Sequence, residues 1–84
     1  MAEASPTSVL DLARLRAAMA SGRAKSIRVA ADLTQAEVAA AIGASRCTIA
    51  SWEQGYRRPW GALALRYIAL LDALERQRGA EARP

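Results

Sequence analysis

The sequence predicts an all-α protein, a compact bundle of about five helices in a single domain spanning residues 1–84. Three observations support this fold class. Apolar residues recur at spacings of three and four along most of the chain. Capping residues and glycines divide that pattern into short segments. No segment shows the alternating pattern of a strand, and the chain has no internal repeat.

The N-terminal third predicts one or two helices. The first apolar face has helical spacing and consists of Val9, Leu12, Leu15 and Met19. Ser8 is expected to cap this helix. A second helical stretch runs from Arg23 to Asp32, and its inner face is formed by Ala24, Ile27, Ala30 and Ala31. The Ser21–Gly22 pair favours two helices over one kinked helix. Residues 1–7 are expected to form a flexible tail.

The window from Gln35 to Gln54 predicts two short helices joined by a tight turn. Thr34 and Glu37 have the spacing of a capping box, which starts a helix over Gln35–Ile42. Gly43 suits the left-handed conformation of a tight bend, Ser45 caps the next helix, Arg46–Gln54, and Gly55 ends it. This is the pattern of a helix-turn-helix, whose second helix enters the DNA major groove.

A long last helix is expected from Trp60 to Arg78, after the basic loop from Tyr56 to Pro59 and before a frayed end at residues 79–84. Its apolar stripe consists of Leu63, Tyr67, Leu70, Leu71 and Leu74, with Trp60, Ala64 and Ile68 beside it. Not every leucine of this helix can face the core, so some apolar surface is expected to remain. A symmetric homodimer would use that surface, whereas covering by the extra N-terminal helix would give a monomer.

Composition excludes several classes of function. The net charge of +4 fits a polyanionic partner, although an arginine-rich, alanine-rich composition is also typical of a GC-rich genome. One cysteine and no histidine exclude an intramolecular disulfide, a zinc site and a Ser–His or Cys–His nucleophile. We therefore expect no enzyme activity, cofactor, metal or small-molecule ligand. The first residues lack a signal peptide, and Arg66 and Asp72 interrupt the longest apolar stretch, so no membrane partner is expected. The expected location is a reducing bacterial cytoplasm, in association with the nucleoid.

Several stretches occur together in one register: Arg23–Arg28, Leu33–Ala39, Ile42–Gly43 and Ile49–Gly55, followed by Arg58–Pro59. As a set, they make the segment from Arg23 to about Leu74 resemble the Cro/C1-type helix-turn-helix family, also called XRE or lambda-repressor-like. The resemblance implies a lambda-repressor-like bundle that binds double-stranded DNA. The chain departs from the family in two places. Trp60 stands where the family usually has Ser or Thr, and an extra helix precedes the usual first one.

Helical geometry places four residues of the second motif helix at the DNA bases: Arg46, Cys47, Thr48 and Ser51. Arg46 suits a bidentate pair with guanine, and the alternatives are a phosphate contact or a solvated side chain. Cys47 is either a small groove residue or, less simply, a redox sensor. Ile49 and Trp52 point the other way and are expected in the core.

The resemblance implies further roles. Gln35 would contact a phosphate and brace Arg46, and the loop residues Gln54, Tyr56, Arg57 and Arg58 would lie along the DNA backbone. Lys25 and Arg23 are candidates for flanking phosphates, with a solvated position as the alternative. An arginine and a glutamate, Arg28 and Glu53, would form a structural ion pair.

Three functions fit these expectations. The first is a sequence-specific transcriptional regulator, most similar to a small phage Cro-like repressor, because 84 residues leave no room for a ligand-binding domain. The second is an antitoxin that binds a toxin and regulates its own operon through the same motif. The third is an excisionase or another architectural protein that bends DNA.

Overall fold

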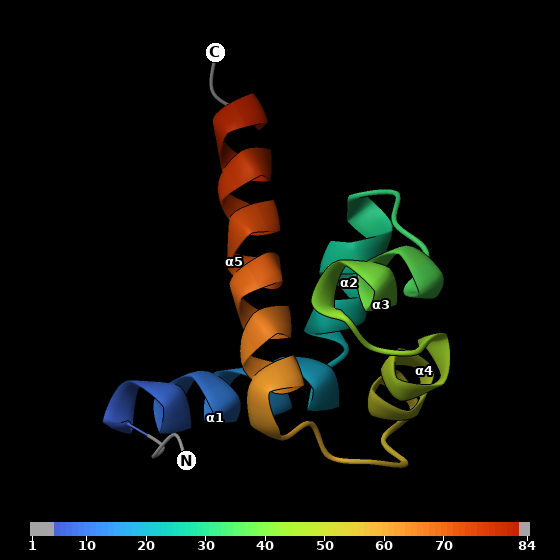
Figure 1. Ribbon diagram of the computed structural model, residues 1–84. Helices are drawn as coiled ribbons and strands as arrows, with labels where there is room; N and C mark the ends of the chain where they lie inside the picture. The colour runs from blue at the N-terminus through green and yellow to red at the C-terminus, as the bar shows by residue number, and fades with distance from the viewer. Residues whose placement is uncertain (1–4, 83–84) are drawn as a thin grey trace.

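The computed structural model describes residues 5–82, and this part of the chain is helical without strands. The five helices are α1 (Pro6–Ala20), α2 (Arg23–Ala30), α3 (Gln35–Ile42), α4 (Arg46–Gln54) and α5 (Gly61–Ala82). Figure 1 shows α5 upright, with α1 crossing it near the first turns of α5, and with α2, α3 and α4 to one side. The predicted all-α bundle is confirmed. Within the described range, no helix is long and apolar enough to cross a membrane.

The first two helices are separate, as the Ser21–Gly22 pair favours, and Gly22 takes a left-handed φ of +81° between them. The expected cap at Ser8 is wrong. Ser5 caps α1, because its Oγ accepts a hydrogen bond from the Ser8 amide at 3.0 Å. Pro6 then occupies the first helical position, where its missing N–H leaves no partner unsatisfied.

Other boundaries also differ from those expected. The second helix ends at Ala30, before a left-handed Asp32 (φ +60°), instead of reaching Asp32. The last helix begins at Gly61, one residue after Trp60, and continues past Arg78 to Ala82. Helix therefore includes residues 6–7 and 79–82, which the sequence placed in flexible tails. The rest of those tails, apart from Ser5, lies outside the described residues.

The caps of α3 and α4 confirm the helix-turn-helix. The Thr34 hydroxyl accepts from the Glu37 amide at 3.0 Å, and the Glu37 carboxylate accepts from the Thr34 amide at 2.9 Å. Ser45 accepts from the Thr48 amide at 3.2 Å. Gly43 has a φ of +81°, which only glycine adopts at little cost, so the chain reverses over three residues.

One apolar core joins all five helices. Its fully buried large side chains are Leu15, Val38, Ile49, Tyr67 and Leu71. Some residues expected on inner faces are instead exposed, namely Val9, Ala30 and Ala31, and Trp60, expected beside the stripe of the last helix, is exposed as well. The first helix covers much of the α5 stripe, and Arg14 of α1 joins Asp72 of α5 at 2.6 Å. The extra N-terminal helix is therefore an integral part of the bundle.

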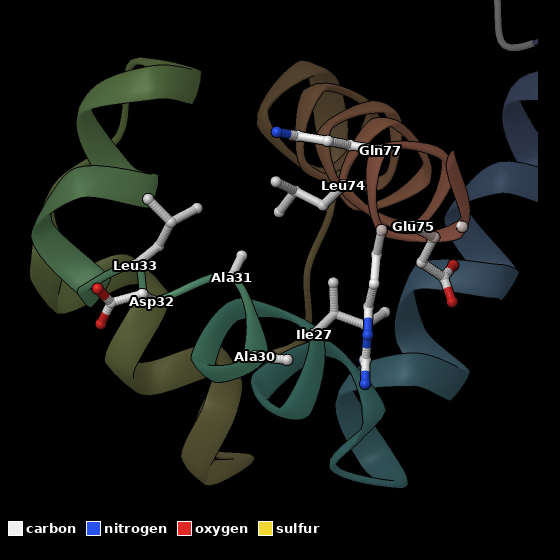
Figure 2. A pocket seen from close by; sticks show the side chains of 10 residues that line it. Ile27, Ala30, Ala31, Asp32, Leu33, Leu74, Glu75 and Gln77 are labelled. Carbon is white, nitrogen blue, oxygen red and sulfur yellow. The ribbon is translucent and has the colours of Figure 1, made fainter. Parts of the chain in front are cut away.

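Part of the apolar surface of α5 stays uncovered, as its leucine content predicts. A cleft of about 660 Å³ lies between the C-terminal part of α5, α2 and the loop before α3. Figure 2 shows Leu33, Leu74 and Ile27 projecting into this cleft, with Glu75 at its edge. We refer to it as the α2–α5 cleft.

The buried Tyr67 gives a testable prediction. Its side chain is fully buried, and its hydroxyl oxygen has no hydrogen-bond partner among the described residues. Tyr67→Phe is expected to raise the free energy of unfolding by about 1–3 kcal/mol, because it removes an unsatisfied buried polar group. Urea denaturation at neutral pH measures this change, and a less stable variant would show that the hydroxyl has a partner.

The same substitution should alter the response to alkali. Burial raises the pKa of Tyr67 from 10.0 to about 12. The unfolded chain therefore ionises first, and the stability from the neutral phenol is lost as the pH rises from about 10 to 12. The phenylalanine variant should lack this part of the alkaline destabilisation.

Candidate nucleic-acid interface

Helix α4 is held by its inner face. Ile49 is fully buried and Trp52 is 5% exposed, as expected for core residues. The Trp52 ring stacks on Tyr67 of α5, with ring centroids 6.1 Å apart and planes inclined by 23°. Because the buried side chains of Ile49 and Trp52 hold the inner face of α4, the orientation of its outer face is also fixed.

That opposite face carries the candidate base-reading residues. Arg46 and Cys47 are exposed, and Thr48 and Ser51 are half-buried. The Thr48 hydroxyl lies 3.0 Å from the hydroxyl of the capping residue Ser45. The free thiol of Cys47 is on the surface. Cys47, Thr48 and Ser51 line one groove beside α4, and Arg46 is exposed at the start of the helix; the groove-facing role of all four remains a prediction.

The expected pair between Arg28 and Glu53 is a buried ion pair. The Arg28 Nε and Nη2 donate to the two Glu53 oxygens at 2.7 and 2.9 Å, and the two side chains are 9% and 3% exposed. Arg28 also donates to the Leu33 carbonyl oxygen at 2.8 Å. This network ties α2 and the start of α3 to the end of α4.

Gln35 belongs to the same network. Its Nε2 donates to Glu53 Oε1 at 3.0 Å. In this structure the Gln35 amide stabilises the buried carboxylate, and its phosphate contact and its brace on Arg46 stay predictions. Burial alone would raise the pKa of Glu53, but hydrogen bonds from Arg28 and Gln35 and the nearby positive charges outweigh it. The pKa of Glu53 is lowered.

The two basic residues at the start of α2 differ. Arg23 donates to both oxygens of Glu75 on α5, at 2.5 and 2.6 Å, so its charge is already paired. The contact of Arg23 with a flanking phosphate stays a prediction, and it would compete with this exposed ion pair. Lys25 is exposed, and its charge contributes to lowering the pKa of Glu53 at the end of α4.

The loop after α4 is fixed at its base and open at its tip. The Tyr56 amide donates to the Ser51 carbonyl oxygen at 2.9 Å, and the Arg16 Nε donates to the Pro59 carbonyl oxygen at 2.9 Å. The side chains of Gln54, Tyr56, Arg57 and Arg58 are all exposed.

A groove of about 510 Å³ separates α4 from the first turns of α5, and we call it the α4–α5 groove. Cys47, Thr48 and Ser51 line one side, and Arg57, Arg58 and Trp60 line another. Arg66 also lines it and donates to the Ile42 carbonyl oxygen at 3.2 Å, which caps the end of α3. Sequence reasoning gave no role to Arg66. The signal that could have indicated a role for Arg66 is its position as a lone arginine between Leu65 and Tyr67 in an apolar segment.

Charge is divided unevenly over the molecule. From residue 38 to residue 71 the only acidic residue is Glu53, and Arg28 neutralises it. The carboxylates of Asp11, Asp72 and Glu75 pair with arginines of α1 and α2. Arg46, Arg57 and Arg58 are therefore exposed positive charges in a stretch whose one carboxylate is already paired, which suits a phosphate backbone.

A capped helix-turn-helix with an open second helix and a basic loop after it is typical of a DNA-binding domain. A family profile described as helix-turn-helix matches residues 25–75, well over half of the chain. The protein belongs to this family, the Cro/C1-type or XRE helix-turn-helix proteins, and is a DNA-binding transcription regulator of that type. The matched range begins within α2, so α1 lies outside it. No curated protein and no solved structure matches the chain.

Proposed function

We propose that this protein is a sequence-specific, Cro-like repressor of the bacterial or phage type, which acts in the cytoplasm by occupying its operator. The observation that carries the proposal is the fixed outward face of α4. Ile49 and Trp52 anchor the helix, while Arg46 and Cys47 are exposed on a side that lacks unpaired acidic groups. A rigidly held helix with an exposed arginine near its start is suited to base readout in the major groove.

Selection of bound duplexes from a random DNA pool tests this proposal. A conserved sequence among the selected duplexes is expected. Binding without sequence preference, accompanied by strong bending, would indicate an architectural protein instead. Copurification of a partner protein that releases the DNA would indicate an antitoxin. Placing the selected site over a promoter should then reduce transcription.

The selection also tests the proposed oligomeric state. We propose a weak homodimer on DNA, because helix-turn-helix readers commonly bind two-fold symmetric sites. The α2–α5 cleft is an apolar surface that the fold leaves open for it. Palindromic half-sites about one helical turn apart support the dimer, whereas a short asymmetric site supports a monomer.

Arg46 gives the sharpest test of direct readout. Arg46→Ala should lose about 1–3 kcal/mol of discrimination at one base pair while the protein stays folded, since the side chain is exposed. Arg46→Lys is the matched control. It retains the charge but not the planar fork, so it should lose the same preference and keep non-specific affinity. Uniformly weaker binding of Arg46→Ala with unchanged base preferences, restored by Arg46→Lys, would instead indicate a phosphate contact. Competition binding with single-base operator variants provides the measurement.

The loop arginines are proposed to contact phosphates. Arg57→Ala combined with Arg58→Ala should weaken binding to all duplexes similarly and reduce the slope of log K against log salt by about 2, that is about 0.9 per phosphate. Arg76→Ala removes a positive charge from the exposed end of α5, outside the α2–α5 cleft, and should leave the slope nearly unchanged. A loss confined to one operator would contradict the phosphate role.

A further inference from the structure

Trp60 is an exposed indole held in a fixed place. Its side chain is 74% exposed, although the residue lies between two constrained neighbours. Pro59 is buried, and Arg16 holds its carbonyl oxygen at 2.9 Å. Gly61 follows with a φ of +72°, which redirects the chain into α5. The backbone on both sides is therefore set, while the indole has little contact with the core.

The surroundings of Trp60 indicate which partner could cover it. It lines the α4–α5 groove together with Cys47, Thr48 and Ser51 of α4. Three arginines line the same groove, and no acidic residue does. A partner that fits it must be anionic and must also present an apolar face. A DNA strand has both properties, because the C–H face of each deoxyribose lies between two phosphates.

We propose that Trp60 packs its indole against the deoxyribose of the strand that lies along the α4–α5 groove, between phosphates held by Arg57 and Arg58. The inference rests on the proposed DNA-binding function and adds a contact of a different kind. An indole on a sugar contributes by burying apolar area, so it carries no charge and reads no base. Trp60 is thus an affinity residue whose contribution is independent of sequence and of salt.

This chemistry gives a signature that differs from those of the other contacts. Trp60→Ala should weaken binding to the selected duplex about tenfold, which corresponds to about 1.4 kcal/mol. The salt slope and the base preferences should not change. Trp60→Phe, which keeps an apolar ring, should recover most of the affinity. Leu10→Ala serves as the control, because Leu10 is similarly exposed (65%) but lies on α1, away from the groove.

Fluorescence provides a second, direct readout, since the only other tryptophan, Trp52, is 5% exposed. Acrylamide should quench mainly Trp60 in the free protein, and the selected duplex should protect it. Because Trp60 is largely outside the core, the thermal unfolding midpoint of Trp60→Ala should match that of the wild type.

The possible outcomes distinguish a failure of this inference from a failure of the proposed function. If the wild type selects no duplex, the proposed function fails. If it binds DNA while Trp60 stays open to acrylamide and Trp60→Ala binds equally well, this inference fails and the proposed function stands. A reduced salt slope, or a lost preference at one base pair, would overturn the sugar contact. Protection by a protein partner and not by DNA would also overturn it.

Discussion

Replacing Arg28 with alanine is expected to lower the free energy of unfolding by about 3–5 kcal/mol. The change leaves the Glu53 carboxylate, only 3% exposed, without its cationic partner. The Leu33 carbonyl oxygen also loses the Arg28 donor. Small domains are stable by only about 5–15 kcal/mol, so a substantial fraction of this variant should unfold near body temperature. Urea denaturation followed by circular dichroism measures the loss.

Arg14→Ala is the matched control, because it breaks an ion pair that faces water. The side chains of Arg14 and Asp72 are 49% and 29% exposed. Water and salt screen such a pair, so the loss of stability should be far smaller than in Arg28→Ala. Equal losses of stability in the two variants would show that the buried Arg28–Glu53 pair contributes no more than an exposed ion pair.

The pH dependence of stability offers an independent check on the same pair. The pKa of Glu53 in the folded protein lies below its ordinary value of 4.5. The unfolded chain therefore takes up this proton first as the pH falls. The stability contributed by the carboxylate is complete above about pH 4.5 and is lost as the pH falls through the folded pKa. Without Arg28 this acid-dependent loss should be smaller.

Leu15→Ala is expected to cost about 2–5 kcal/mol, because Leu15 is fully buried and the substitution leaves a cavity. Leu15 lies on α1, outside the residues that match the family profile. Leu10→Ala, on the exposed side of the same helix, should change stability by no more than about 0.5 kcal/mol. Thermal unfolding by circular dichroism compares the two variants. A single transition that moves only in Leu15→Ala would show that α1 and the motif unfold as one unit. A separate early transition would contradict this.

Local signals in the sequence predicted most of the helix boundaries. The bounds of α3 and α4 follow from N-capping residues and C-terminal glycines, which interact only with backbone groups a few residues away. The start of α1 was missed because Ser8 suits a cap as well as Ser5 does. Pro6, directly after Ser5, was the signal for the earlier cap. The last helix could not be bounded in the same way, since its beginning depends on a buried Pro59 that Arg16 of α1 holds.

The site was less predictable than the fold, because its contacts join distant parts of the chain. The face of α4 follows from helical periodicity, and the family resemblance implied the Arg28–Glu53 pair. Neither source revealed that Gln35 also serves Glu53, or that Glu75, 52 residues away, takes up the charge of Arg23. Side-chain partners of this kind depend on tertiary packing, which no local pattern encodes.

The exposed arginines around α4 give that side of the molecule a positive electric field. Carboxylates of α1 and α5 neutralise arginines on their own side, while Arg46, Arg57 and Arg58 lie on the side of α4. A polyanion attracts that side of the protein before any contact forms. The protein is therefore expected to arrive at DNA with α4 already turned towards it. Productive collisions should become rarer as added salt shortens the range of that field.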